Sequence, residues 1–333
     1  MKSILRSTAI VAAGIALSTS ALAGCNRAPG DVGVAVGYSS YTVSNPFFAG
    51  MQKGLETGSA EHGFDLISTN ANNDANQQVS DIQNLINRGA KYILLVPADG
   101  KAVAPAIAAA DAAKVPVIVI ADTVEPPVTS TIALDNVVAG RAAAQQIIKH
   151  LQEKYGSPRG NVVNITGLSG TPSATGRNQG FVEEIGKYPE VKIVATADGG
   201  YDTEKSNTVM SDILQAQSQI DAVFSGNDAQ AVGVSKAIQS AGRFVAIGQP
   251  GHIYVIGVDG SAPAIADIRN GIQDATISQN PIKMAEVATD LVADLEAGKT
   301  VEKNVVYPLQ LIDASNINSK EVADYGIWAD EVK

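Results

Sequence analysis

The sequence contains a single cysteine, Cys25, so no disulfide can form within the chain. Its three histidines, His62, His150 and His252, lie far apart in the sequence, with no cysteine or carboxylate at the spacing of metal ligands. We therefore expect no metal site. Aromatic residues are few, at 5%, but 45% of the 333 residues are hydrophobic, which excludes a disordered chain. This length and composition favour two domains with ordinary cores.

The motifs of catalysis and cofactor binding are also missing. There is no glycine-rich dinucleotide fingerprint. The run Ala297-Gly298-Lys299-Thr300 resembles the end of a phosphate-binding loop, but that loop needs a glycine where this chain has Ala293. In Gly167-Leu168-Ser169-Gly170 the second glycine adjoins the serine, which is not the spacing of a nucleophile elbow. The sequence therefore predicts neither an enzyme nor a bound cofactor.

Acidic residues outnumber basic residues in this sequence. The chain has 24 lysines and arginines against 34 acidic residues, for a formal charge of −10. The first 24 residues hold two of the basic groups and no acid, so the remainder is more acidic still. Such a surface repels phosphate backbones, and we expect no nucleic-acid partner.

The first 24 residues have the three parts of an export signal. Lys2 and Arg6 supply the basic part, Thr8–Leu17 the apolar centre, and Ala21-Leu22-Ala23 the small residues before a cleavage site. The apolar centre is too short to span a bilayer. We therefore predict a signal peptide over residues 1–24.

The cysteine lies directly after this segment. Leu22-Ala23-Gly24-Cys25 resembles the lipoprotein signal, in which Cys25 becomes the first residue and is lipidated. This interpretation predicts a lipidated tether over residues 25–30 and a location in the periplasm or cell envelope, anchored to the membrane by lipid. The alternative is cleavage after Ala23, which would give a secreted protein with a free thiol.

The first unit after the tether has the order strand, loop, helix. Asp31–Gly37 is apolar and rich in valine, a polar loop follows, and Asn45-Pro46-Phe47-Phe48 is typical of a helix start. Ligands of open α/β sheets bind at the carboxyl ends of the strands, so the loop with Tyr41, Ser44, Asn45 and Phe47 is the first candidate site. Neighbouring helical residues lie about 100° apart, so we expect at most one of Phe47 and Phe48 to be fully in the core.

The alternation of strands and helices continues along the chain and restarts after residue 135. Further strands are expected over 64–69, 92–96, 115–121, 131–134, 161–165, 191–195, 222–225 and 253–258. Helices are expected over 47–62, 77–88, 102–113, 139–155, 177–187, 202–217 and 229–241, with a loop over 166–176. Two such series predict two doubly wound, parallel-sheet α/β lobes. No residue-level repeat relates them.

Polar side chains follow four of the expected strands and the run Ala275–Ser278. They are Asn45, Asp122, Asn227-Asp228, Asp259 and Gln279-Asn280. Turn chemistry alone makes asparagine and aspartate common after strands, so each of them could be structural. If the two lobes face each other, however, the five groups converge on one cleft.

At these residues the sequence resembles the type I periplasmic binding proteins, in the ribose-binding subgroup that shares its core with the LacI-type repressors. The resemblance covers about residues 31–310. It rests on Asn45-Pro46-Phe47-Phe48, Asp135-Asn136, Gly170-Thr171 with Arg177 and Gly180-Phe181, Ala222-Val223-Phe224 with Asn227-Asp228, Gly257-Val258-Asp259-Gly260 and Ala275-Thr276-Ile277-Ser278-Gln279.

The resemblance implies a sugar held between two lobes joined by a three-strand hinge, with crossings near Asp135, Gln279 and Gln310. The N-terminal lobe would be 31–134 plus 280–310, and the C-terminal lobe 135–279 plus 311–333. The family's ligand contacts fall on Asn45, Phe47, Phe48, Arg177, Tyr201, Asn227, Asp259 and Gln279.

Three positions depart from the ribose binders. Tyr201 stands where they have phenylalanine, and Tyr41 where a small hydroxyl residue is usual. Their fourth strand ends in an Asp-Arg pair, whereas this chain has Asp122-Thr123. Asp122 either takes the arginine position or supplies the aspartate with Thr123 in place of the arginine, and a guanidinium is missing in both cases. Arg243–His252 is an insertion with no assigned role.

We therefore expect a monomeric substrate-binding lipoprotein that binds a monosaccharide or polyol and presents its closed form to an ABC permease in the inner membrane. The ligand-binding set is Asn45, Phe47, Phe48, Arg177, Tyr201, Asn227, Asp259 and Gln279, with Tyr41 and Asp122 added. A sugar-sensing adaptor for a chemoreceptor or sensor kinase would use the same residues. A repressor would need a DNA-binding helical pair before Asp31, where the export signal stands.

Overall fold

The computed structural model describes residues 33–331. The predicted signal peptide (1–24), tether (25–30) and lipidated Cys25 lie outside this range. Among the described helices, none combines the length and the apolarity needed to cross a membrane.

The first sheet has six strands in the order β11-β5-β4-β3-β1-β2, and all neighbouring strands are parallel. The strands are β1 (Ala35–Ser40), β2 (Asp65–Asn70), β3 (Tyr92–Val96), β4 (Val117–Ile120), β5 (Ser130–Ala133) and β11 (Asn304–Val306). The chain reverses its direction of travel across the sheet between β1 and β3, which is where ligands bind in doubly wound folds.

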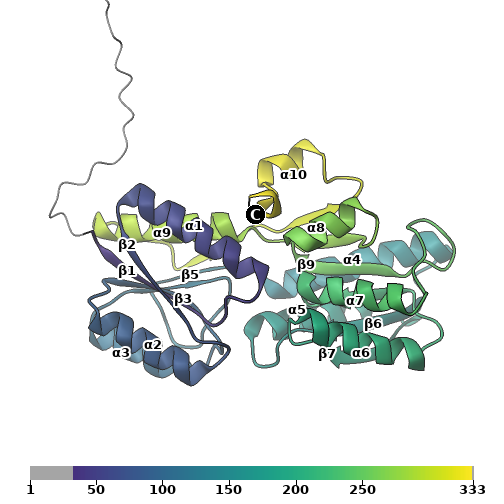
Figure 1. Ribbon diagram of the computed structural model, residues 1–333, viewed down its shortest axis with the longest axis horizontal. Coiled ribbons are helices and arrows are strands. Elements are labelled where there is room, and N and C mark those ends of the chain that lie inside the picture. Colours follow the sequence, from purple (N-terminus) through teal and green to yellow (C-terminus); the bar gives the residue numbers. More distant parts are fainter. Residues whose placement is uncertain (1–32, 332–333) are drawn as a thin grey trace, which may run out of the picture. The chain divides into compact units, whose positions relative to one another are not determined.

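Helices cover both faces of this sheet (Figure 1). One face packs against α1 (Pro46–His62) and α9 (Pro281–Glu296), and the other against α2 (Ala75–Asn87) and α3 (Ala104–Ala112). In β3 all five residues are buried, and successive side chains enter the two cores in turn. This is the continuous apolar run expected for a strand with helices on both sides.

The second sheet repeats the pattern in the order β12-β10-β9-β8-β6-β7, with only β12 antiparallel to its neighbour. Its strands are β6 (Gly160–Thr166), β7 (Val191–Asp198), β8 (Ala222–Ser225), β9 (Tyr254–Asp259), β10 (Ala275–Ser278) and β12 (Gln310–Asp313). One core contains side chains of α4 (Asn136–Tyr155) and α5 (Pro172–Ile185), the other those of α6 (Thr203–Ala216) and α7 (Asp228–Ser240). The prediction of two doubly wound α/β lobes is confirmed.

The chain passes between the two sheets three times in the described range. It leaves the first sheet after β5, returns to that lobe after β10, and leaves again between β11 and β12. These passages lie near the three crossings predicted at Asp135, Gln279 and Gln310. The lobe boundaries given above, residue by residue, stay a prediction.

The largest differences from the predicted helix starts are at α4 and α5, and both arise because a side chain caps the helix. The Asp135 carboxylate accepts a hydrogen bond from Val138 N at 3.0 Å, so α4 begins at Asn136 rather than at 139. The Thr171 hydroxyl accepts from Ala174 N at 3.2 Å, and Pro172 occupies the first turn of α5. The predicted loop over 166–176 is therefore wrong for its last five residues.

The C-terminal part contains elements that were not predicted. They include α8 (Ala262–Arg269), α10 (Lys320–Tyr325), a 3₁₀ turn, η1 (Trp328–Asp330), and the short strands β11 and β12. The 3₁₀ turn contacts α8, and its tryptophan is completely buried.

Candidate functional site

One cavity collects the polar strand ends of both lobes. Its empty volume is about 380 Å³, a figure that includes space open to solvent. All ten residues predicted to bind a ligand line it, together with three that were not predicted. The lining is Tyr41, Asn45, Phe47, Phe48, Val96, Ala121, Asp122, Ser173, Arg177, Tyr201, Asn227, Asp259 and Gln279.

The loop after β1 and the first turn of α1 supply the first wall. Asn45 caps α1, with its side-chain oxygen accepting from Phe47 N at 3.0 Å, so its NH₂ group remains as the donor. Tyr41 packs edge-on against Phe48, with ring centroids 4.9 Å apart. Ser44 does not line the cavity, and its hydroxyl pairs with that of Thr42 at 2.9 Å.

Both phenylalanines of α1 are buried, so the expectation that at most one would be is wrong. Phe47 is 4% exposed and Phe48 5%, and both line the cavity. The expectation considered only the spacing of the two side chains around α1 and not what packs against the helix from outside. The outward side of the first turn is in fact covered, because the Phe47 ring lies edge-on to Trp328, 6.4 Å between centroids.

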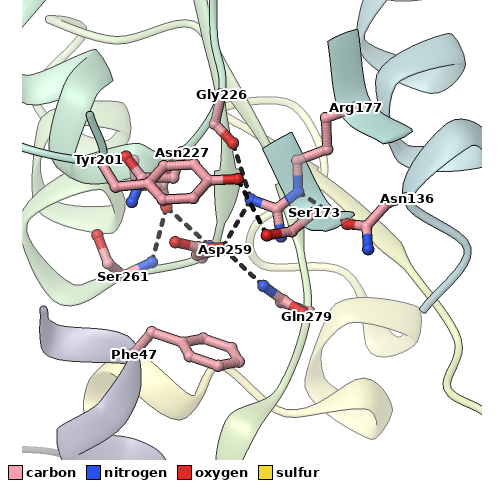
Figure 2. Close-up of polar contacts among 12 residues, drawn as sticks. Phe47, Asn136, Ser173, Arg177, Tyr201, Gly226, Asn227, Asp259, Ser261 and Gln279 are labelled. Carbon is pink, nitrogen blue, oxygen red and sulfur yellow. Dashed lines mark hydrogen bonds and ion pairs between the residues drawn. The ribbon is translucent and has the colours of Figure 1, made fainter. Parts of the chain in front are cut away.

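Arg177 projects from α5 and is held on three sides (Figure 2). Its Nε donates to Asn136 Oδ1 at 3.0 Å, and one terminal nitrogen donates to the Gly226 carbonyl at 2.7 Å and lies 3.5 Å from Asp259 Oδ1. The backbone beneath it is also constrained, since a Cβ at Gly140 of α4 would collide with the Arg177 carbonyl. The guanidinium is therefore fixed before any ligand arrives.

Asp259 is the most constrained acid of the site. Its φ of +130° is rare for a residue with a side chain. Gln279 Nε2 donates to its carboxylate at 2.7 Å (Figure 2), and the Asp259 carbonyl oxygen accepts from Trp328 Nε1 at 2.9 Å. The Gln279 Oε1 atom is buried without a hydrogen-bond partner among the described residues. An unpaired acceptor therefore lies beside the carboxylate.

Two of the strand-end groups expected in the cleft have structural roles instead. The Asp228 carboxylate accepts from Gly260 N at 2.7 Å and from Ser261 N at 2.8 Å, and so holds the turn after β9. Asn280 caps α9 by accepting from Lys283 N. Neither residue lines the cavity. Turn and cap chemistry therefore account for these two residues.

The remaining wall combines an aromatic ring with a second capping asparagine. The Tyr201 hydroxyl donates to Ser173 Oγ at 3.2 Å, and its ring lies 5.9 Å from the Arg177 guanidinium. Asn227 caps α7 through its side-chain oxygen, which accepts from Gln230 N, and this leaves the NH₂ group as a donor. Ser173 was missed because α5 was predicted to begin at residue 177.

Backbone strain concentrates at this cavity. Six non-glycine residues in the described range have positive φ, and three of them, Ala121, Tyr201 and Asp259, line the cavity. Such conformations cost on the order of 1–3 kcal/mol each and persist where the surroundings enforce them.

Asp122 comes from the first lobe and meets the second. Its carboxylate accepts from Thr123 N at 2.9 Å and from Ser173 N, at the start of α5, at 3.4 Å. A carboxylate at a helix N-terminus is favourable because the exposed N–H groups carry partial positive charge. Asp122 lines the cavity and Thr123 does not. The lining residues contain one arginine, Arg177, so the second guanidinium of the ribose binders has no counterpart here.

Burial makes both acids hard to ionise. It raises the pKa of Asp122 to about 6, although the hydrogen bonds from Thr123 and Ser173 oppose the shift. Burial also raises the pKa of Asp259, against the opposing effect of the Arg177 charge. Donors that arrive with a ligand would stabilise the ionised forms.

Two of the histidines, although far apart in the sequence, lie close together in the fold. The His150 and His252 rings lie 6.1 Å apart, and His252 Nε2 pairs with Asp274 Oδ1 at 2.8 Å. His252 Nδ1 pairs with the Val245 carbonyl, and this hydrogen bond fixes the Arg243–His252 insertion. The insertion borders a second cavity at the opposite ends of the second sheet's strands. The described residues contain no group of three or more potential metal ligands.

Comparison with known proteins gives one consistent result. A family model described as periplasmic binding protein domain matches residues 36–300. The ribose import binding protein RbsB of Bacillus subtilis is 34% identical over 277 residues, covering 83% of this chain and 86% of that protein.

Solved structures agree in fold. The myo-inositol binding protein of Caulobacter, with myo-inositol bound, has a TM-score of 0.78 at 28% identity and covers 87% of this chain and 97% of its own. A periplasmic solute binding protein of an ABC transporter from Actinobacillus succinogenes, with D-allose bound, has a TM-score of 0.77 at 26% identity, with coverages of 84% and 98%.

The raised pKa of Asp122 predicts a pH-dependent effect of its neutralisation. The folded pKa of about 6 exceeds the ordinary value of 3.8, so this carboxyl favours folding most below pH 4 and loses that contribution as pH rises through 6. Relative to the native protein, Asp122→Asn should therefore gain on the order of 2 kcal/mol in unfolding free energy between pH 4 and pH 8, measured by urea unfolding. The exposed Asp111→Asn is the control. A difference that does not change with pH would contradict the assignment.

Proposed function

This chain belongs to the periplasmic binding protein family, and from that premise we propose that it binds a neutral monosaccharide or polyol between its lobes for uptake by an ABC importer. The observation that carries the proposal is the cavity itself, in which both lobes present polar groups suited to hydroxyls. The relatives are substrate-binding proteins, and this chain is a binding protein rather than an enzyme.

The polar lining supports a polyhydroxylated ligand. Each sugar hydroxyl donates one hydrogen bond and accepts others. The donors are the Arg177 guanidinium and the free NH₂ groups of Asn45 and Asn227, whose oxygens are occupied as helix caps. The acceptors are the carboxylates of Asp122 and Asp259. Donors and acceptors therefore come from both lobes.

The apolar lining supports a ring or carbon chain with exposed C–H groups. Phe47 and Phe48 lie in the first lobe and Tyr201 in the second, and all three rings line the cavity. Aromatic faces pack favourably against such C–H surfaces while hydroxyls reach the polar groups at the edge. A few contacts of each kind are enough for micromolar affinity, about −8 kcal/mol.

Charge narrows the ligand class. Two carboxylates and one guanidinium line the cavity, so an anionic ligand would meet an excess of negative charge when the acids are ionised. This argues against sugar phosphates and sugar acids. The names of the relatives point the same way, since the compounds they carry, ribose, D-allose and myo-inositol, are uncharged.

Closure would transmit the binding event. A ligand stabilises a closed state only by the contacts that it gains there, and here those contacts would come from two lobes. We propose that the closed surface is what a permease recognises. Because one chain supplies the whole lining, we also propose that the monomer is the functional unit.

We further propose that the mature chain begins at Cys25 and is anchored through a lipid on this residue. The support is the run Leu22-Ala23-Gly24-Cys25 after an export signal, and the lack of any other cysteine with which Cys25 could pair. Such an anchor would keep the protein at the membrane that contains the permease.

Binding of a sugar or polyol should be measurable directly. A thermal-shift panel of pentoses, hexoses, polyols and cyclitols should contain compounds that raise the melting temperature, and calorimetry should give the affinity. Asp259→Asn should weaken that affinity by roughly 10- to 100-fold, since it removes charge-assisted hydrogen bonds. The exposed Glu190→Gln, in the same lobe, should leave the affinity unchanged. A panel without any stabilising compound would refute the ligand class.

Lipidation can be tested in cells that export the full chain. The native protein should incorporate labelled palmitate and fractionate with membranes, and Cys25→Ser should be released in soluble form. Labelling that persists in Cys25→Ser, or a native protein recovered entirely in the soluble fraction, would exclude the anchor at this position.

A further inference from the structure

The C-terminal segment Ile327–Glu331, called the strap below, lies against both lobes behind the cavity. It contains the single tryptophan of the chain, Trp328, which is 0% exposed. The segment follows α10 at the C-terminal end of the ribbon, in yellow in Figure 1. Trp328 does not line the cavity, but it contacts residues that do.

The strap is attached to the second lobe by two sets of hydrogen bonds. Trp328 Nε1 donates to the Asp259 carbonyl oxygen at 2.9 Å. The Arg269 guanidinium of α8 makes a bidentate pair with Asp330, at 2.9 and 2.8 Å. Gly260 packs closely here, because a Cβ there would collide with Ser278 Oγ and would lie 3.2 Å from Trp328 Nε1.

The strap also contacts α1 of the first lobe. The Phe47 ring lies edge-on to the indole, and a Cβ on Gly50 would lie 3.2 Å from the indole ring. The Lys53 ammonium donates to the Glu331 carbonyl. One indole therefore contacts two cavity residues, Asp259 and Phe47, that belong to different lobes.

The hydrogen bond from Trp328 Nε1 is accepted by the carbonyl oxygen of Asp259, whose backbone is strained. Asp259 has a φ of +130°, and such a conformation persists only where its surroundings enforce it. The indole N–H fixes the carbonyl on one side of this peptide, while Asp228 holds the N–H groups of Gly260 and Ser261 on the other. Together they set the direction in which the Asp259 carboxylate enters the cavity.

We propose that Trp328 is a positioning residue for ligand binding, which holds Asp259 in its strained conformation and, through Phe47, links that residue to α1 of the first lobe. The proposal rests on the proposed function for its ligand, but its structural part can be tested without one.

Hydrogen exchange tests the positioning part. Trp328→Phe keeps an apolar ring and removes the N–H donor. If that donor holds the turn, the amides of Gly260 and Ser261 should exchange roughly three- to tenfold faster than in the native protein, which corresponds to one lost hydrogen bond. The Val223 amide in β8 serves as the reference within the same lobe. Unchanged exchange at 260 and 261, or an equal increase at 223, would overturn the proposal.

A matched control and a milder variant complete the test. Lys320→Gln removes an exposed ion pair with Asp324 on α10 and should change exchange at neither amide. Should Trp328→Phe fail to fold, Asp330→Asn loosens the strap at its exposed anchor on Arg269 and should accelerate the same two amides. Unchanged exchange in Asp330→Asn would then overturn the proposal.

Affinity provides the functional readout. With a ligand found in the panel, Trp328→Phe should bind roughly three- to tenfold more weakly by calorimetry, while Lys320→Gln binds like the native protein. Equal affinities of Trp328→Phe and native protein would overturn the positioning role. A native protein that binds no member of the panel would refute the proposed function, and exchange at Gly260 and Ser261 would still decide whether the strap holds Asp259.

Discussion

The buried carboxylate of Asp259 is the constraint on which the site depends. Taking a carboxylate out of water is costly unless hydrogen bonds and an opposite charge compensate. Here Gln279 donates to it at 2.7 Å, while Arg177 lies 3.5 Å away and is itself shared with two other acceptors. The compensation is incomplete, as the raised pKa of Asp259 indicates. Under the proposed function, a ligand that supplies hydroxyl donors from within the cavity would complete this compensation, and binding would then be energetically linked to closure.

Preorganisation explains how so small a set of groups can select a ligand. Arg177 is fixed by Asn136, by Gly226 and by the close approach of α4 and α5 at Gly140. Asn45 and Asn227 use their oxygens as helix caps, which determines the side on which their donors point. Groups held in place before binding lose little conformational freedom when the ligand arrives, and this favours affinity and specificity. Under the proposed function, the same asparagine side chains would serve as helix caps and as ligand donors.

Much of the fold could be predicted because it follows local rules, and apolar runs such as 92–96 indicated the strands. Strand-end topology alone predicted that polar residues such as Asp122, Asn227 and Asp259 would converge on one cleft if the lobes face each other. The resemblance to the family instead supplied Phe48, Arg177 and Tyr201, and all ten predicted ligand residues line one cavity. The errors arose where tertiary contacts decide. Asp228 holds a turn, and Phe47 is covered by Trp328 from the far end of the chain. No local sequence pattern predicts such contacts between distant residues.

The central claim is that residues of both lobes bind one hydroxylated molecule in this cavity. A crystal structure of the protein with the tightest binder of a carbohydrate panel tests it most directly. The account predicts hydroxyls bonded to Asp259 and Arg177 on one side and to Asn45 or Asp122 on the other, with an aromatic ring against the C–H surface. A ligand bound to one lobe alone, or seated in the second cavity beside the Arg243–His252 insertion, would contradict it.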